Sequence, residues 1–598
     1  MSINKEKIPF INIFLARRLD DISYIIINNK DLYTDVVSMA EAVYNNNFLI
    51  LNKLRNDVYS KDSNHYLWKY DFYSRYNFKD SYYLDARKVN VLGTGFDIKV
   101  PWEISRMEYL FALAMGYRAT KEEKYVSKIF YIIDDFIDCN PYNYGVNWDV
   151  SMEIGIRLAN IVLACELIQD SPIFHNHYEK IKDLAFKHAV HIKENLENNR
   201  IPNNHYLGDL LGLATAYALI PDLFNKEDFN FVIQETHREI KRQVLFDGVD
   251  FECSTSYQRL SGEIIAFTII ALSKIGFSLD DEERELLKKM CEFTILIMDR
   301  NKKVPRVADL DSGRVFQLFL EEDSNHSFYL NVMLPLITNR IFNKDCLYKY
   351  GSFIFSKCDE EINISRDSEI IHFKASDFVS YKNDDYSLFV SICNPEIFKS
   401  HWHAHNDVLS FVLNVDGVEF ITDPGVGEYT CSEEKRNVFR TVKNHSTVSI
   451  DDNEQRLFSQ TSIDAMFDWE TIIKKNSVII KDKTISGSIS YIDENKLLLV
   501  HERTFKISDV EFFINDVVKN MKHHCHFYLP IHPSIDINVI DEHSVELVND
   551  KRKVLITGSW FFSIGEGIFA YQYKDYVTSK KIIGYSEKSE NYCLFKIE

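Results

Sequence analysis

Residues 410–423 read SFVLNVDGVEFITD, a stretch that decides the fold of the second half of the chain. Short runs of β-branched and aromatic residues lie on either side of Asp416-Gly417, a dipeptide that favours a two-residue hairpin turn. Before the turn, Phe411, Leu413 and Val415 would share one face of a strand. The stretch therefore predicts an antiparallel hairpin.

The same pattern recurs along the rest of the second half. Comparable runs appear after about residue 345, in SFIFSKC (352–358), YSLFVSIC (386–393), KLLLVHERTF (496–505) and VEFFINDVV (510–518). Short runs of this composition are typical of strands. We therefore expect residues 346–598 to be all-β, as a sandwich.

The first half has helical periodicity instead. Residues 148–168 (WDVSMEIGIRLANIVLACELI) place Trp148, Met152 and Ile156 four residues apart, on one face of a helix. Residues 204–220 repeat the pattern. Further amphipathic stretches lie near residues 104–118, 122–138, 180–197, 262–275 and 281–298. Many helices of similar length predict an all-α layered or toroidal domain. No linker rich in Gly, Pro or Ser follows it, so the two domains are expected to pack closely.

Composition limits the kinds of partner. A chain of 598 residues is too long for one compact core, so two or more domains are expected. The formal charge of -20 argues against a nucleic-acid partner. A polyanionic substrate would need a local basic cleft, because the whole protein repels it. The 33 Tyr and 42 Phe include candidates for stacking on sugar rings, although most aromatic residues fill cores.

The N-terminus and the cysteines bear on the cellular setting. Residues 1–23 read MSINKEKIPFINIFLARRLDDIS, where the apolar run is interrupted and soon followed by charges. This is neither a good secretory signal nor a run long enough for membrane insertion. Cytoplasmic residence is the default expectation, with periplasmic or secreted residence if a leader is missing from this sequence. Ten scattered Cys without C-x-x-C pairs fit reduced thiols.

The densest polar cluster in the sequence is SHWHAHND, residues 400–407. Three histidines, His401, His403 and His405, alternate along it and would point the same way in an extended segment. Histidine suits both proton transfer and metal ligation. The alternative is a polar loop with incidental histidines.

Two further candidate ligands follow this cluster. Asp423 precedes Pro424-Gly425, and His445 lies in RTVKNHST, residues 440–447. His, Asp and His are plausible zinc ligands. However, a simple two-residue hairpin pairs Asp423 with Ser410 and not with His405. Strand register therefore does not predict a metal triad.

The helical half contributes three polar segments. Asn204 and His205 follow Pro202-Asn203 at the start of a helix, where Asn is commonly a cap. In FECSTSYQR (251–259), Tyr257 near Arg259 could be an acid or base with a lowered pKa, although such a Tyr alone is more often structural. Residues 304–314 (VPRVADLDSGR) suggest an ordered polar loop.

A second histidine-rich segment follows the strand run VEFFINDVV. It contains His523, His524, Cys525 and His526. Adjacent strand positions alternate between faces, so we expect these side chains not to converge. We interpret them as surface or core residues.

Taken together, several segments resemble the heparinase II/III family of polysaccharide lyases, from about Trp102 to beyond His445. The matching segments are PWEISR, GVNWDVSMEIGIRLAN, PNNHYLGDLLGL, FDGVDFECSTSYQR, PRVADLDSGR, HWHAHNDVLSF, TDPGVGEYT and RNVFRTVKNHSTV. The resemblance rests on their number and order. It implies an N-terminal α/α toroid, an incomplete barrel of helical hairpins, over residues 1–345. An antiparallel β-sandwich over residues 346–598 would follow it.

The resemblance also implies catalytic roles. Tyr257 matches the catalytic Tyr of these lyases, and His403 matches their catalytic His. Asn204 or His205 matches the site that neutralises the substrate carboxylate. The implied partner is an acidic polysaccharide or oligosaccharide.

A metal site follows from the same comparison. His405, Asp423 and His445 match the ligands of one structural zinc near the cleft, and no organic cofactor is implied. His445 is followed by Ser-Thr where Asn-Thr is more usual, a change beyond the ligand itself.

Four residues are candidates for holding the glycan. Arg259 is a candidate for binding a carboxylate or a sulfate, and Glu252 lies in the same segment. Trp148 and Trp402 are candidate stacking platforms, although either could belong to the core.

The implied reaction is β-elimination, which gives a 4,5-unsaturated uronate. A uronyl C5-epimerase on the same scaffold would share the proton abstraction, and the sequence does not separate the two. A non-catalytic glycan-binding or capsule-assembly protein is the third alternative. The presence of both Tyr257 and His403 argues against it.

Overall fold

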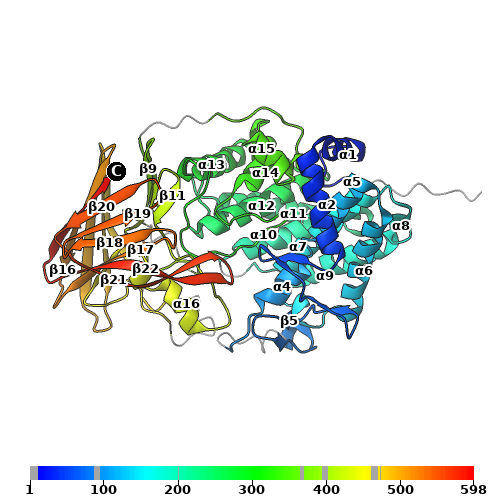
Figure 1. Ribbon diagram of the computed structural model, residues 1–598. Helices are drawn as coiled ribbons and strands as arrows, with labels where there is room; N and C mark the ends of the chain where they lie inside the picture. The colour runs from blue at the N-terminus through cyan, green and yellow to red at the C-terminus, as the bar shows by residue number, and fades with distance from the viewer. Residues whose placement is uncertain are drawn as a thin grey trace, which may run out of the picture.

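The computed structural model describes residues 11–85, 94–198, 201–363, 369–392, 402–459, 469–471 and 473–598. Figure 1 shows its helices gathered on one side and its strands on the other, as the two periodicities predicted. The predicted order of a helical toroid followed by antiparallel β-sheets is confirmed. Among the described residues, no helix combines the length and the apolar character needed to cross a membrane.

The long helices of the helical part pack side by side, and the starts of α7, α10 and α12 lie at the same end. Helix α7 packs against both α5 and α10, and α10 packs in turn against α12. The helices are α1 (Leu19–Asn28), α2 (Lys30–Tyr44), α4 (Lys99–Ser105), α5 (Leu110–Thr120), α6 (Glu123–Cys139), α7 (Ser151–Ile168), α8 (Pro172–His175), α9 (Tyr178–Glu194), α10 (Asn204–Leu219), α11 (Lys226–Gln243), α12 (Thr255–Ser273), α13 (Asp281–Ile297), α14 (Ser327–Thr338) and α15 (Lys344–Lys349), with the 3-10 turns η1 (Val146–Trp148), η2 (Pro221–Leu223) and η3 (Ser352–Phe355).

Three small β-hairpins interrupt the helical part, which periodicity alone did not predict. They pair β1 (Phe48–Ile50) with β2 (Lys53–Arg55), β3 (Tyr59–Ser60) with β4 (His65–Tyr66), and β5 (Tyr70–Asp71) with β6 (Tyr76–Asn77). Strands of two or three residues are too short to show an alternating pattern in sequence.

The change from helices to sheets lies between η3 and β7. Helix α15 crosses the boundary expected at residues 345 and 346, and the first strand of the β part begins at Ile370.

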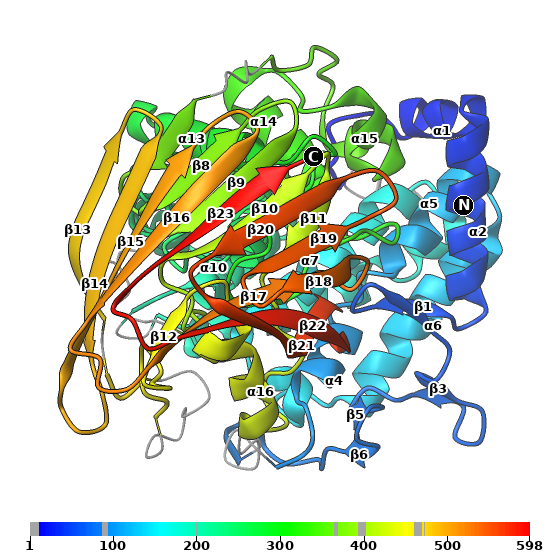
Figure 2. The same cartoon turned by 60° about the vertical axis from the view of Figure 1, so that its left-hand side comes forward.

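The β part consists of two antiparallel sheets. One has the order β21-β22-β17-β11-β10-β9-β8-β7, with β12 paired to β17, and the other has the order β13-β14-β15-β16-β23-β20-β19-β18. Figure 2 shows the second sheet at the front with its strands spread across the view, and β13 lies at its left-hand edge. The strands are β7 (Ile370–Phe373), β8 (Phe378–Lys382), β9 (Tyr386–Ser391), β10 (Ser410–Val415), β11 (Val418–Ile421), β12 (Val448–Ile450), β13 (Lys474–Lys481), β14 (Thr484–Ile492), β15 (Leu498–Ile507), β16 (Glu511–Lys519), β17 (Cys525–Ile531), β18 (Asp536–Asp541), β19 (Ser544–Val548), β20 (Lys553–Gly558), β21 (Phe561–Gln572), β22 (Asp575–Ser586) and β23 (Glu590–Ile597), with α16 (Glu433–Arg440) and η4 (Val442–Asn444) between β11 and β12.

Aromatic residues fill the space between the two sheets. Phe411 of β10 lies edge-on to Phe505, Phe512 and Phe595 of the other sheet, with ring centroids 5.7–5.8 Å apart. Edge-to-face packing at this distance is favourable beyond the area that it buries. Phe411 therefore connects its hairpin to three strands of the opposite sheet.

The hairpin itself forms where the sequence predicted it. Val415 pairs with Val418, and both turn residues have positive φ, 51° at Asp416 and 76° at Gly417. Positive φ at both positions suits Asp-Gly and the twist of the flanking strands. The register then shifts between Leu413 and Asn414, so Leu413 pairs with Ile421.

The two parts pack directly on each other. Ahead of α4, Asp97 accepts a hydrogen bond from Thr430 Oγ1 (2.9 Å) and another from the Tyr573 hydroxyl, and it pairs with Lys574 Nζ (2.9 Å). Asp247, after α11, accepts from the backbone N–H groups of Ala375 (2.8 Å) and Ser376 (2.9 Å). The close packing expected from the missing linker is confirmed.

Candidate active site

A cavity of about 390 Å³ lies where the helical part meets the β part. Its walls come from α4, from the starts of α7, α10 and α12, and from two segments of the β part. The residues that line it are Ile98, Lys99, Trp102, Arg106, Asp149, Val150, Met152, Glu153, Asn203, Asn204, His205, Tyr257, Leu260, Asp311, Trp402, His403, Tyr429 and Thr430.

Helix caps position the residues from the helical part. The Asn203 side chain accepts from the backbone N–H of His205 and caps α10, so Asn204 and His205 begin the helix at the cavity wall. Ser254 accepts from the N–H of Tyr257 (3.3 Å) and caps α12. The interpretation of the first Asn as a cap is correct.

Tyr257 and His403 meet inside the cavity. Their rings are stacked, with centroids 3.8 Å apart. The Tyr257 hydroxyl donates to Asp311 Oδ2 at 3.1 Å. Burial, and next the negative charge of Asp311, raise the pKa of Tyr257 well above its ordinary value. The lowered pKa expected from a neighbouring Arg was therefore wrong.

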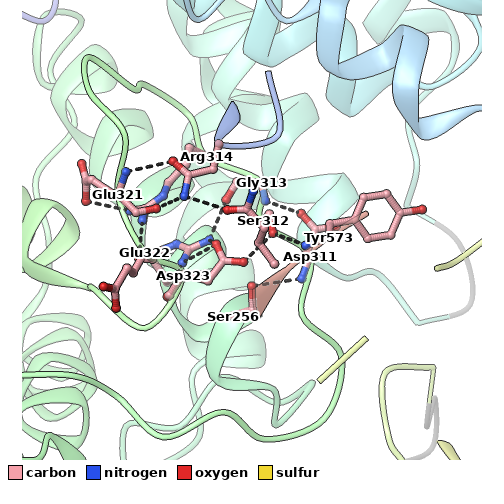
Figure 3. A network of polar contacts seen from close by, with 12 residues as sticks. Ser256, Asp311, Ser312, Gly313, Arg314, Glu321, Glu322, Asp323 and Tyr573 are labelled. Atoms are coloured by element: carbon pink, nitrogen blue, oxygen red, sulfur yellow. Dashed lines mark hydrogen bonds and ion pairs between the residues drawn. The ribbon is translucent and has the colours of Figure 1, made fainter. Parts of the chain in front are cut away.

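Arg259 faces away from the cavity. It is fully buried, and its guanidinium donates to the backbone oxygens of Asp323 (2.7 Å) and Gly313 (3.1 Å). Its partners belong to the polar loop of residues 311–323, which Figure 3 shows with Tyr573 reaching into it from the β part. Arg259 holds this loop in place and does not line the cavity.

Asp311 connects the tyrosine to a buried lysine. Lys99 Nζ lies 3.1 Å from Asp311 Oδ2 and donates to Glu103 Oε1 at 2.6 Å. Although burial opposes its charge, Asp311 has its pKa lowered to about 2, chiefly by Lys99 and Arg106. Asp311 therefore remains a carboxylate that accepts the hydrogen bond of the Tyr257 hydroxyl.

Two carboxylates hold His403. Its Nδ1 lies 2.8 Å from Asp309 Oδ2, and its Nε2 lies 3.1 Å from Glu252 Oε2. Although burial opposes the charged ring, the hydrogen bonds that it donates to the Asp309 and Glu252 carboxylates raise the pKa of His403 to about 9. The ring is therefore fixed at both nitrogens.

Asp309 contacts two histidines. Its Oδ1 also contacts His405 Nε2 at 2.9 Å, and Arg436 pairs with both of its oxygens at 3.2 and 2.8 Å. Against the cost of burial, Arg436 and then the histidines hold the pKa of Asp309 well below its usual range. One carboxylate thus links the histidine of the cavity to a candidate metal ligand.

Glu252 orients the amide of Asn204. Its Oε1 accepts from Asn204 Nδ2 (2.8 Å) and from the Asn204 backbone N–H (3.2 Å). Asn204 is 1% exposed, and its Oδ1 has no hydrogen-bond partner among the described residues. Glu252 itself lies behind Asn204 and His403 and does not line the cavity.

His205 lies on the more open side of the cavity. Its side chain is 35% exposed, and its Nδ1 lies 3.1 Å from Glu197 Oε1. Although burial works against the charged ring, Glu197 raises the pKa of His205 above its ordinary value. His205 can therefore bring a proton to an anionic group in the cavity.

The two candidate tryptophans have different positions. Trp402 lines the cavity and is only partly buried. Trp148 is 2% exposed, donates its Nε1–H to Asn140 O (3.2 Å) and packs against the His188 ring. Of the two candidates, only Trp402 therefore lines the cavity, whereas Trp148 belongs to the core.

His405, Asp423 and His445 converge as the resemblance implied. Their ligand atoms all lie within 4.8 Å of one another, and all three residues are buried. His445 Nδ1 lies 3.1 Å from Asp423 Oδ2, and His405 Nδ1 makes no hydrogen bond within the described ranges. A buried imidazole nitrogen left unpaired beside a carboxylate and a second imidazole fits a zinc ion. The first histidine of the cluster, His401, lies outside the described residues.

The charges around the cavity are mixed. Lys99 and Arg106 line it, but Arg106 is paired with Glu153 at 2.5 Å and with Glu103 at 2.9 Å. The strongly basic cleft that a polyanion would need is therefore absent from the described walls.

Several residues of the site were not singled out from the sequence. They are Lys99, Arg106, Asp309, Asp311, Tyr429 and Arg436. Some signal was present, because Asp309 and Asp311 lie in the predicted polar loop and Arg106 ends PWEISR. Their partners lie too far away in the sequence for spacing to reveal the contacts.

The comparisons with known proteins agree with this geometry. Residues 27–322 match the description "Heparinase II/III N-terminus", and residues 365–590 match "Heparinase II/III-like, C-terminal". A heparin-sulfate lyase of Pedobacter heparinus is 22% identical over 448 residues, which cover 69% of this chain and 60% of that protein. The chain thus spans less than two thirds of the length of that relative.

Solved structures share the fold. A crystal structure of heparinase III has a TM-score of 0.70 at 14% identity, covering 100% of this chain and 87% of that one. Chondroitin AC lyase of Streptomyces coelicolor A3, solved with chondroitin sulphate, has a TM-score of 0.52 at 9% identity, covering 86% and 78%. At these identities the likeness shows the fold alone. With both halves matched in order, the chain belongs to the heparinase II/III family of polysaccharide lyases.

Proposed function

We propose that this protein cleaves a uronic-acid-containing polysaccharide by β-elimination, leaving a 4,5-unsaturated uronate. The observation that carries the proposal is the meeting of Tyr257, His403, Asn204 and His205 at one cavity. The reaction breaks the C5–H bond and the C4–O4 bond and forms a C4–C5 double bond. It needs a group that stabilises the carboxylate, a base at C5 and an acid at O4.

Asn204 and His205 are suited to the substrate carboxylate. The Asn204 amide is held by Glu252 through one N–H, which leaves Oδ1 unpaired in the cavity wall. That oxygen accepts a hydrogen bond from a protonated carboxyl group, and His205 supplies a proton or a charge from the open side. Together they favour the anion that forms when the C5 proton leaves.

Tyr257 is suited to protonating the leaving group. Its raised pKa means that it holds its proton at neutral pH, and Asp311 fixes the direction of the hydroxyl. A group that keeps its proton until O4 departs acts as a general acid. This assignment follows from burial and from the neighbouring carboxylate.

His403 is suited to proton transfer at C5 from the other side of the stacked pair. Its raised pKa, about 9, leaves the ring charged at neutral pH, so it acts as a base only after Nε2, which faces Glu252, has given up its proton, while Nδ1 stays held by Asp309. The C5 configuration decides which face of the sugar carries the proton. Whether Tyr257 or His403 removes it therefore differs between glucuronate-like and iduronate- or mannuronate-like substrates.

We also propose one structural zinc at His405, Asp423 and His445. Bound there, the ion would hold the segment that carries His403 through ligand geometry rather than act on the glycan. The elimination itself requires no redox cofactor.

The test is a screen of acidic polysaccharides with ultraviolet absorbance of the unsaturated uronate as the readout. Wild type should generate the absorbance on at least one uronate polymer, and Tyr257→Phe should not. Tyr206→Phe is a matched control, because that buried hydroxyl donates to Glu235 at 2.9 Å and does not line the cavity.

The same assay separates the alternatives. A C5-epimerase would exchange the C5 hydrogen with deuterated water without producing absorbance. A glycan-binding protein would retain polymer while doing neither. Either result with the wild-type protein would overturn the proposed lyase activity.

A further inference from the structure

We propose a second metal site, for a divalent transition-metal ion, formed by Asp452, His524 and His526. Their ligand atoms all lie within 4.8 Å of one another. Asp452 Oδ2 lies 3.0 Å from His524 Nε2, and Asp452 Oδ1 lies 3.4 Å from His526 Nδ1. The site is separate from the cavity and does not depend on the proposed lyase activity.

The expectation that the histidines of this segment do not converge holds only for adjacent positions. His524 and His526 are two residues apart at the start of β17, so they lie on the same side. Their ring centroids are 4.9 Å apart. The carboxylate that completes the group comes from the turn after β12, far away in the sequence.

One nitrogen of the cluster lacks a well-formed hydrogen bond. His526 Nδ1 is buried, and its contact with Asp452 Oδ1 at 3.4 Å is not a well-oriented hydrogen bond. A buried polar atom without a partner is uncommon and calls for a water, an ion or a catalytic role. Coordination would satisfy it.

The backbone around the three side chains is already fixed. The neighbouring Asp451 carboxylate accepts from the backbone N–H groups of Lys522 (2.7 Å), His523 (2.7 Å) and His524 (3.1 Å). Strand β12 pairs with β17 so that Ser449 lies opposite His526. The two segments that carry the site are thus held together before any ion binds. This lowers the entropy cost of ordering the side chains when an ion binds.

The chemistry of the donors selects the kind of ion. Two imidazoles and one carboxylate suit zinc, cobalt, nickel or copper, whereas calcium and magnesium prefer oxygen ligands. In a tetrahedral zinc site with bonds of about 2.0–2.1 Å, ligand atoms lie roughly 3.3 Å apart. The His524 side chain is 25% exposed, so water can reach the site and supply the fourth ligand.

One cation competes for the same carboxylate. Lys443 Nζ lies 3.7 Å from Asp452 Oδ1, but its side chain is 46% exposed and its partner 48% exposed. Exposed pairs of this kind are weak, and the flexible lysine can turn into solvent. The lysine is therefore displaced when an ion binds.

The site has a structural consequence for the candidate active site. Just after Asp452, Glu454 Oε2 accepts from Asn406 Nδ2 (2.6 Å) and Gln455 Oε1 accepts from the Val408 N–H (3.0 Å). An ion that fixes Asp452 to β17 therefore stabilises the turn that supports residues 405–408.

The test is zinc binding to the purified protein, measured by calorimetry after removal of loosely held metal with a weak chelator. Wild type should bind one added equivalent of Zn²⁺, and excess Mg²⁺ should not compete. His524→Gln and His526→Gln should each weaken binding at least tenfold. His523→Gln is the matched control, because that neighbouring side chain is exposed and outside the cluster.

Two further measurements test whether the added zinc binds at this cluster and not at the other candidate site. Added Zn²⁺ should raise the melting temperature of wild type and of His523→Gln, but not that of His526→Gln. The added equivalent should persist in His445→Ala, which lies in the other candidate site. Wild-type protein that takes up no added zinc, or histidine variants that bind like wild type, would overturn the proposal.

Discussion

The Tyr257 ring lies nearly parallel to the His403 ring, with 21° between their planes and 3.8 Å between their centroids. The first residue belongs to α12 and the second to the β part. Their contact exists only while the two parts are docked, so the integrity of the interface is a condition for any chemistry at this cavity.

Replacing Tyr257 by Phe should abolish turnover and leave the fold nearly intact. The ring keeps its stacking on His403, and only the hydrogen bond to Asp311 is lost, which costs about 1 kcal/mol of stability. Loss of a general acid should lower the rate about 10²–10⁴-fold. The measurements are formation of unsaturated product and thermal melting. Turnover close to that of wild type would remove Tyr257 from the mechanism.

Replacing His445 by Ala should remove about one equivalent of tightly held metal and lower thermal stability. The variant takes away a ligand that lies 3.1 Å from Asp423 Oδ2. Elemental analysis after washing with a weak chelator provides the measurement. His501→Ala is the control, because His501 is also buried and pairs with Asp516 at 2.8 Å outside the cluster. Unchanged metal content in His445→Ala would take this residue out of the site.

Replacing Asp309 by Asn should reduce both activity and stability. The change removes one carboxylate that pairs with the buried Arg436, and breaking a buried pair of this kind costs about 3–5 kcal/mol. It also weakens the hold on His403, so the rate should fall roughly 10–100-fold, as for other residues that orient a ligand or catalytic group.

Asp516→Asn is the control for this prediction. Asp516 likewise joins a buried histidine, His501 (2.8 Å), to a buried arginine, Arg503 (2.7 Å), but it lies in the sheet that contains β15 and β16. Both variants should melt earlier, whereas only Asp309→Asn should lose turnover measured well below its melting temperature. Equal activities in the two variants would show that Asp309 has only a structural role.

The stability of the helical part should depend on pH through Glu166. Burial raises the pKa of this α7 carboxyl from 4.5 to about 7, although the backbone N–H groups of Ile13, Phe14 and Leu15 donate to it. Between these values the folded state binds a proton that the unfolded state has lost, so stability falls as pH rises. The loss amounts to about 3 kcal/mol across this window.

Melting temperatures of wild type and Glu166→Gln between pH 4.5 and 7.5 provide the measurement. The variant should lack the decline with rising pH, because glutamine carries no titrating proton. Glu179→Gln is the control, because the Glu179 side chain is 81% exposed. Parallel curves for wild type and Glu166→Gln would contradict the assignment.

The sequence predicted the secondary structure better than the polar network. Helical periodicity and the Asp416-Gly417 turn are local properties, and both parts of the fold follow from them. The expectation that Arg259 binds the substrate was wrong because Arg259 lies two positions after Tyr257 on α12, so the two side chains face different directions.

Contacts between distant segments explain what could not be predicted. Asp309 meets both His403 and His405 only because the loop after α13 packs under the β part. The register shift between Leu413 and Asn414 likewise follows from packing and has no local signal. The grouping of His405, Asp423 and His445 was predicted from the family resemblance, because their spacing in the sequence does not indicate it.

The contact of Tyr573 with the helical part has a consequence for the order in which the protein is completed during synthesis. Its backbone N–H donates to Ser312 Oγ (2.9 Å), and its hydroxyl donates to Asp97, yet it lies between the last two long hairpin strands β21 and β22. Domains made first generally fold first on the ribosome. The loop beside Asp311 can therefore form these contacts only after nearly the whole chain has left the ribosome. The helical part alone cannot form the complete cavity before the β part has folded.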